Sequence, residues 1–298
     1  MRSTLVAAAV LAASLAVSPA QRDARVTIYI AVEDQAGRPE RSVAADALSL
    51  SVDGIPRPIE SVVRADQPLS AILLVDTSAS MKSIAPLLQR SAKDLIANLG
   101  ESDRWRIGVF GDRILFAREF ASGRRSFDWP PPDPIEVRTR PVRGGSPLWD
   151  AVRQSVELLA EQGGRRTLVV MTDGRASGNQ YGLEEVAEFT ADGAVSVSAI
   201  VPVPAVGIRQ DRQTMAVVSP AANLDRLARY TGGVLLGGYD PKDAPLRQML
   251  PLAHRLRAGH AVTFVMPTPD SRRHRLEIGI ATRGLQVRAP LAFRVASR

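Results

Sequence analysis

Apolar residues recur with two different spacings along this chain, and the spacing changes twice. Residues 25–32 alternate between apolar and polar, which is the period of a half-buried β-strand. From Leu69 onward, short solidly apolar runs alternate with stretches whose apolar residues recur every three or four positions, the spacing of helices. Beyond Gly259 the period of two returns. The pattern therefore predicts a β-rich segment, an α/β segment and a second β-rich segment.

The α/β segment alternates predicted strands with predicted helices. We expect strands at residues 71–75, 106–110, 166–172, 195–201 and 234–236, and helices at 84–99, 146–161, 183–190, 224–230 and 246–257. A further strand at 114–120 forms a hairpin with 106–110, and the proline-rich stretch 121–145 is expected to be a long loop. Such alternation favours an α/β fold with a mostly parallel central sheet flanked by helices.

The two β-rich flanks cover residues 21–68 and 259–298, on either side of an α/β domain at 69–258. Their predicted strands are 25–32, 48–52, 56–63, 262–266, 275–280 and 285–291. Asp53-Gly54 predicts a hairpin that joins 48–52 to 56–63. Each flank is too short to bury much surface alone. We expect the flanks to pair into one small β-sandwich, with separate packing of each on the central sheet as the alternative.

Residues 1–20 have the pattern of an export signal. Arg2 provides a positive start, residues 5–17 are apolar, and small residues precede Gln21. A membrane anchor is the alternative, but thirteen apolar residues are fewer than the roughly 20 that a spanning helix needs. We therefore expect cleavage and a mature protein that is periplasmic or secreted, without an integral membrane segment.

Composition excludes several kinds of chemistry. The chain has no cysteine, so disulfides, thiolate metal sites and a cysteine nucleophile are excluded. Its net charge of +7 comes mainly from scattered arginines that are not interleaved with aromatic residues, so no nucleic-acid partner is expected. His254, His260 and His274 lack metalloprotease spacing and are expected at the surface or in packing roles. Serine-hydrolase and phosphate-loop motifs are also absent, so we do not expect an enzyme.

Oxygen-bearing side chains gather where predicted strands end or helices begin. Asp76, Ser78 and Ser80 follow the buried strand at 71–75, Ser146 opens a helix, and Asp173 follows the strand at 166–172. The carboxyl ends of strands are where ligands bind in open α/β sheets. Carboxylate and hydroxyl oxygens suit a hard cation such as Mg²⁺. The sequence therefore predicts a metal site formed by these five residues.

Simpler roles remain open for some of these residues. Ser146 could be only the N-cap of a helix that has Pro147 in its first turn. Asp173 before Gly174 could be only a turn residue. Asp112 fits a hairpin turn best and is left out of the site.

Three motifs carry a resemblance to a known family. They are Asp76-Thr77-Ser78-Ala79-Ser80, Gly144-Gly145-Ser146 and Thr172-Asp173-Gly174. In order and spacing they resemble the metal-ion-dependent adhesion site of von Willebrand factor type A domains. The resemblance covers residues 69–257, and residues 32–37 and 52–54 are similar to the segments that precede this domain in a bacterial group of secreted von Willebrand factor A-related proteins.

The resemblance implies a role for each site residue. Ser78, Ser80 and Ser146 would bind the ion directly, and Asp76 and Asp173 would act through water molecules. The ion would be Mg²⁺, or Mn²⁺ or Ca²⁺ in its place. The third motif usually carries threonine, and serine keeps the hydroxyl but has a looser rotamer, so we expect somewhat weaker metal affinity.

Neutral hydroxyl ligands leave most of the ion's charge available, and one coordination position is expected to stay open. We therefore expect an exported protein that binds, or adheres to, a protein partner presenting an Asp or Glu carboxylate. The loop at 121–145 is expected to rim the site, with Phe127 and Trp129 as candidate specificity residues. One alternative is a structural envelope component whose ion only stabilises the fold, and another is an accessory subunit of an exported enzyme complex.

Overall fold

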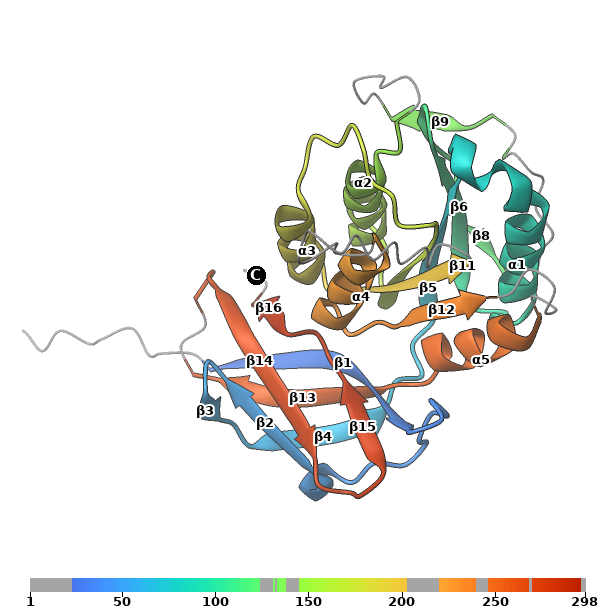
Figure 1. Ribbon diagram of the computed structural model, residues 1–298. Coiled ribbons are helices and arrows are strands. Elements are labelled where there is room, and N and C mark those ends of the chain that lie inside the picture. The colour runs from blue at the N-terminus through green and yellow to red at the C-terminus, as the bar shows by residue number, and fades with distance from the viewer. Residues whose placement is uncertain are drawn as a thin grey trace, which may run out of the picture.

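The structure is a computed structural model that describes residues 23–123, 131, 133–137, 145–202, 220–239, 246–267 and 270–295. It has two parts, an α/β domain and a β-sandwich beneath it (Figure 1). The predicted export signal, Gly144, Phe127 and Trp129 lie outside the described residues.

The α/β domain is built on one large mixed sheet. Its strands are β5 (Leu69–Asp76), β6 (Arg104–Phe110), β7 (Ile114–Phe116), β8 (Ala121–Ser122), β9 (Ile135–Val137), β10 (Arg165–Met171), β11 (Val195–Pro202) and β12 (Leu235–Tyr239). The order is β12-β11-β10-β5-β6-β7-β9, and β8 also pairs with β6. The strands from β12 to β6 are parallel, whereas β7, β8 and β9 pair antiparallel. The predicted α/β class with a mostly parallel sheet is confirmed.

Helices cover both faces of this sheet (Figure 1). The 3₁₀ helix η2 (Ala79–Ile84) leads into α1 (Ala85–Ala97), which packs with α5 (Leu246–Arg257) on one face. The helices α2 (Leu148–Ala160), α3 (Leu183–Asp192) and α4 (Pro220–Tyr230) cover the other face. Every residue of β5 is buried, with Leu73 in one core and Leu74 in the other. A strand that is buried on both faces has a continuous apolar sequence, and this pattern made β5 predictable.

The position of β5 determines where the candidate site lies. β5 pairs in parallel with β6 on one side and with β10 on the other. The chain runs from β5 through α1 to β6, and it reaches β10 only later, on the opposite side. The carboxyl end of β5 therefore lies at a topological switch point, where open α/β sheets form ligand-binding crevices.

The β-sandwich contains strands from both flanks of the chain. Its strands are β1 (Ala24–Asp34), β2 (Leu48–Val52), β3 (Ile55–Pro56), β4 (Ile59–Arg64), β13 (His260–Met266), β14 (Arg273–Ile280), β15 (Leu285–Arg288) and β16 (Ala292–Arg294), with a 3₁₀ turn η1 (Ala45–Ala47). One sheet has the order β15-β1-β13-β4 and the other β16-β14-β2-β3. Both contribute to one apolar core that includes Ile28, Leu50, Phe264 and Leu276. The alternative in which each flank packs separately is wrong.

Two of the predicted strands end earlier than expected because of proline. The hairpin partner of β2 is only β3, and the chain then crosses to β4 in the other sheet. Likewise the strand predicted at 285–291 ends with β15 at Arg288, and β16, which was not predicted, follows from Ala292 in the other sheet. Pro56, Pro58 and Pro290 occur at these crossings, and proline cannot donate a hydrogen bond to a strand ladder. The stretch 121–145, expected to be mainly loop, contributes two short strands among its described residues.

Candidate metal centre

Asp76 is the last residue of β5, and its carboxylate is held by two hydrogen bonds. The residue is 1% exposed. The backbone N–H of Ser78 donates to Oδ1 over 2.8 Å, and the Thr172 hydroxyl donates to Oδ2 over 2.7 Å. The Thr172 hydroxyl in turn accepts the N–H of Gly174. The ends of β5 and β10 are therefore joined through one buried carboxylate.

Burial makes the charge of Asp76 costly. It raises the pKa of this carboxyl above its ordinary value, and the nearby Asp173 raises it further, while hydrogen bonds from Ser78 and Thr172 lower it. Within the described residues Asp76 has no ion pair with an arginine or lysine. Two neighbouring carboxylates, one of them buried without a countercharge, form a place where a cation would be stabilising.

Ser78 and Ser80 lie beside this carboxylate. Their Oγ atoms are 3.3 Å apart, which follows from the tight 3₁₀ turn of η2 that begins at Ala79. Neither hydroxyl caps the turn, because no side-chain cap bond forms at Ser78. Ser78 is half-buried and Ser80 is exposed, so this side of the site opens to solvent.

Ser146 is buried, and its hydroxyl has no hydrogen-bond partner among the described residues. The N-cap prediction for it is wrong, because α2 begins two residues later, after Pro147, and no side-chain cap bond forms. The Asn179 side chain instead accepts the backbone N–H of Trp149 over 2.7 Å. Buried hydroxyls almost always find a partner. A buried hydroxyl without a partner among the described residues, bonded through its backbone to the loop that follows Asp173, fits a hydroxyl that binds a cation.

Asp173 lies in the loop that follows β10. Its Oδ1 accepts the backbone N–H of Arg175 over 3.0 Å, and the Arg175 guanidinium lies 3.7 Å from its Oδ2. Gly174 follows with φ +81°, and a Cβ there would lie 2.9 Å from the backbone of Pro220. Asp173 does therefore form a turn, as its simpler interpretation predicts. The turn also keeps its carboxylate near Asp76.

The loop after Asp173 is fastened to the start of α2. Ser146 and Ser177 exchange two bonds: the Ser146 N–H donates to the Ser177 hydroxyl, and the Ser177 N–H donates to the Ser146 carbonyl. The buried carboxylate of Asp150 accepts the N–H groups of Gln180 and Tyr181. Sequence reasoning missed this anchoring. The only sign of this anchoring in the sequence is Asp150, an aspartate within the apolar start of the helix predicted at 146–161.

Replacing Asp150 with alanine is expected to destabilise the protein by roughly 1.5–3 kcal/mol, because the part-buried N–H groups of Gln180 and Tyr181 lose a charged acceptor. Urea unfolding would measure the loss, and hydrogen exchange at Gln180 and Tyr181 would show the loop loosening. The half-buried Glu157 on the same helix, which interacts with Arg153 and Gln154, is the control, and Glu157→Ala should cost less than about 1 kcal/mol. Equal losses in the two variants would contradict the anchoring role.

The structure places the five predicted residues at one edge of the sheet. Asp76 is hydrogen-bonded to Ser78, whose hydroxyl lies beside that of Ser80, and Asp173 is close enough to raise the pKa of Asp76. Ser146 joins the Asp173 loop through Ser177. The described residues contain no group of three or more His, Cys, Asp or Glu that could hold a metal ion. Any ion here would need serine hydroxyls beside the two carboxylates. This all-oxygen set fits Mg²⁺ and similar hard cations.

Comparison with known proteins finds similarity only in solved structures. No protein-family model and no curated protein matches the sequence. BatB from Bacteroides thetaiotaomicron is 18% identical, with 62% of this chain and 97% of that chain covered and a TM-score of 0.43. The ArnB paralog VWA2 from Sulfolobus acidocaldarius is 12% identical, with 92% and 76% covered and a TM-score of 0.47. A von Willebrand factor type A structure from Catenulispora acidiphila is 8% identical, with 90% and 73% covered and a TM-score of 0.41.

These likenesses concern the fold. Structures of von Willebrand factor A domains are thus among those similar to this chain. Separately, none of the helices in the described part of the chain has the length and apolar character needed to cross a membrane.

Proposed function

We propose that this chain is a von Willebrand factor A-type protein that binds a protein partner through a divalent cation. The observation that carries the proposal is the buried, unpartnered hydroxyl of Ser146 at the sheet edge that also holds Asp76 and Asp173. Ser78, Ser80 and Ser146 would bind the ion directly through their hydroxyls, and Asp76 and Asp173 would hold it through water molecules. When bound, the ion would offer an open position to a carboxylate from the partner.

The burial of the site residues supports binding from one side. Asp76 and Ser146 are buried, Ser78 is intermediate, and Thr77 and Ser80 are exposed. The protein thus supplies the inner ligands from strand and helix ends, and leaves the outer side to solvent. Specificity would come from contacts around the ion, because one carboxylate contact rarely suffices for stable binding.

We further propose that the protein is exported and has no catalytic activity of its own. Residues 1–20 support export through their signal-like pattern. The sequence supports binding because it contains no serine-hydrolase or phosphate-loop motif. The second candidate function is structural, with the ion stabilising the fold and recruiting nothing; the network that joins β5, β10 and α2 favours it.

A capture experiment separates these two functions. Immobilised mature protein is incubated with envelope extract of the producing cells, in Mg²⁺ or in chelator, beside Ser146→Ala. Recruitment predicts a partner that is retained in Mg²⁺, released by chelator and lost with the variant. A partner recovered equally in all conditions, or none in any, would favour the structural function.

A further inference from the structure

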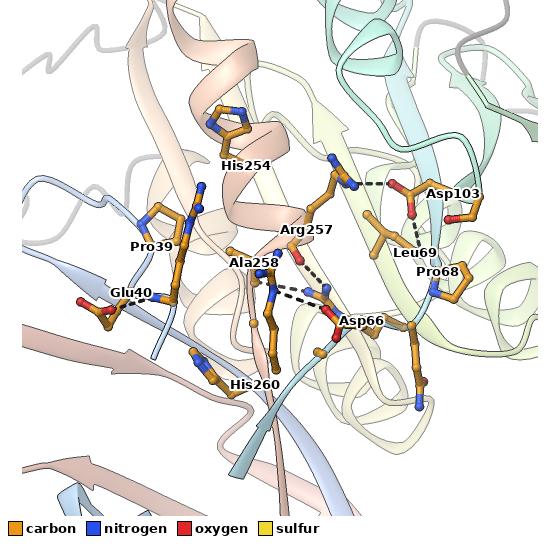
Figure 2. A pocket seen from close by; sticks show the side chains of 17 residues that line it. Pro39, Glu40, Asp66, Pro68, Leu69, Asp103, His254, Arg257, Ala258 and His260 are labelled. Carbon is orange, nitrogen blue, oxygen red and sulfur yellow. Dashed lines mark hydrogen bonds and ion pairs between the residues drawn. The ribbon is translucent and has the colours of Figure 1, made fainter. Parts of the chain in front are cut away.

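A second site lies at the opposite end of β5 from the candidate metal centre, about 23 Å away along the strand. There the β-sandwich meets the α/β domain around a polar cleft of about 350 Å³ (Figure 2). The cleft is lined from the sandwich by Arg41, Arg64 and His260, and from the α/β domain by Asp103, Arg165 and Arg257. This volume lies at the lower end of small-molecule sites.

The acidic side chains of the cleft already have partners. Asp103 accepts the backbone N–H groups of Leu69 and Gly100, and the Arg257 guanidinium lies 3.3 Å from its Oδ2 (Figure 2). Glu40 accepts two backbone N–H groups from the residues that follow it. Asp66 pairs with Arg64 over 3.3 Å. Arg64 and Arg257 therefore have carboxylate partners, and Glu40 keeps its negative charge in the cleft. Arg41 and Arg165 are the cations of the cleft that form no ion pair with a described residue.

Arg165 is one of those cations. Its guanidinium donates to the carbonyl oxygens of Leu256, Arg257 and Ala258, at the carboxyl end of α5. Burial lowers the pKa of Arg165, and the nearby Tyr29 and Asp103 oppose this shift only in part. The partial negative charge of the helix end offsets this cost in part. The guanidinium charge is not paired with a carboxylate among the described residues.

Arg41 and His260 add further donors on the sandwich side. Arg41 is exposed and forms no ion pair with a described residue. His260 is 3% exposed, and neither ring nitrogen has a hydrogen bond in the described part of the chain. Burial lowers the pKa of His260, while the backbone of Arg41 and the carboxylate of Glu40 oppose this shift. Figure 2 shows His260 on the strand side of the cleft, below the end of α5 that carries Arg257 and Ala258.

We propose that this cleft binds a small oxyanion, a molecule that presents a carboxylate or phosphate group. Arg41 and Arg165 supply the charge, and they do so from different domains. His260 provides a donor once its ring turns toward the ligand. A bound oxyanion would therefore hold the sandwich and the α/β domain together. The candidate metal centre is not involved, so the two sites can be tested separately.

Calorimetric titration of the full mature chain with citrate and with inorganic phosphate tests this proposal. It is performed in metal-free buffer, because both anions chelate divalent cations, and at constant ionic strength. We expect saturable binding of at least one anion. Arg41→Ala should weaken it about tenfold, since one charge-assisted contact is lost. Arg41 is the residue of choice because it is exposed, whereas substitution of Arg165 would uncap α5.

Arg275→Ala is the matched control, because Arg275 is an exposed arginine of the sandwich outside the cleft. It should bind both anions as the wild type does. Citrate and phosphate also stabilise proteins nonspecifically by exclusion from their surface. Absence of saturable binding in the wild type, or equal affinities in the Arg41 and Arg275 variants, would overturn the proposal.

Discussion

Replacing Asp76 with asparagine is expected to stabilise the metal-free protein and to abolish the stabilisation that Mg²⁺ gives the wild type. Without an ion, Asp76 is a buried charge that faces Asp173 and lacks a countercharge among the described residues. Asparagine retains the shape, accepts the Ser78 N–H and removes the charge. We expect a gain on the order of 1 kcal/mol in chelator.

Mg²⁺ should stabilise the wild type more than the Asp76 variant. At a concentration one hundred times its dissociation constant it should stabilise the wild type by about 2.7 kcal/mol and the Asp76 variant by much less. Urea unfolding in Mg²⁺ and in chelator measures both effects. Asp112→Asn, in the exposed turn after β6, is the control and should behave as the wild type. A variant that is weaker in chelator yet gains fully from Mg²⁺ would contradict the metal-centre assignment.

Replacing Ser146 with alanine should separate metal binding from folding. The hydroxyl is buried without a partner, so its loss removes an unsatisfied polar atom and creates almost no cavity. We expect metal-free stability to remain equal or to rise by about 1 kcal/mol. Metal affinity should fall tenfold to one hundredfold or more. Mutation of residues that only orient a metal ligand already lowers affinity by this amount.

Two further serine variants make this result specific. Ser155 is a buried serine of the same helix whose hydroxyl donates to the Ala151 carbonyl. Ser155→Ala should leave metal affinity unchanged. Ser146→Thr keeps the hydroxyl on a stiffer side chain and should retain or improve metal binding. Loss of stability without loss of metal affinity in Ser146→Ala would assign Ser146 a purely structural role.

Much of the fold could be predicted because its signals are local. The apolar run before Asp76 marks a strand buried on both faces, and the alternation of strands and helices indicates the parallel sheet. The prolines at 56, 58 and 290 were visible, yet the sheet that the chain joins after each of them depends on packing between distant segments. Strand existence was therefore predictable, whereas strand pairing in the sandwich was predictable only in outline.

In the candidate site, too, contacts between residues close in sequence could be predicted, and contacts between distant segments could not. The residues of Asp76 to Ser80 are close in sequence, so their proximity in space follows from the tight turn of η2. The anchoring of Asp150 to Gln180 spans thirty residues and leaves no periodic pattern. For Ser146, a serine before a proline indicates an N-cap, and only the packed loop reveals that the Asn179 side chain accepts the N–H of Trp149 instead.

Calorimetric titration of the metal-free wild-type chain with Mg²⁺, and with Mn²⁺ as a second probe, tests the central claim most directly. We predict saturable uptake of one ion per chain, strongly reduced in Asp76→Asn and Ser146→Ala and preserved in Ser155→Ala. Failure of the wild type to take up either ion, or equal uptake by all four proteins, would contradict the assignment of this sheet edge as a metal centre.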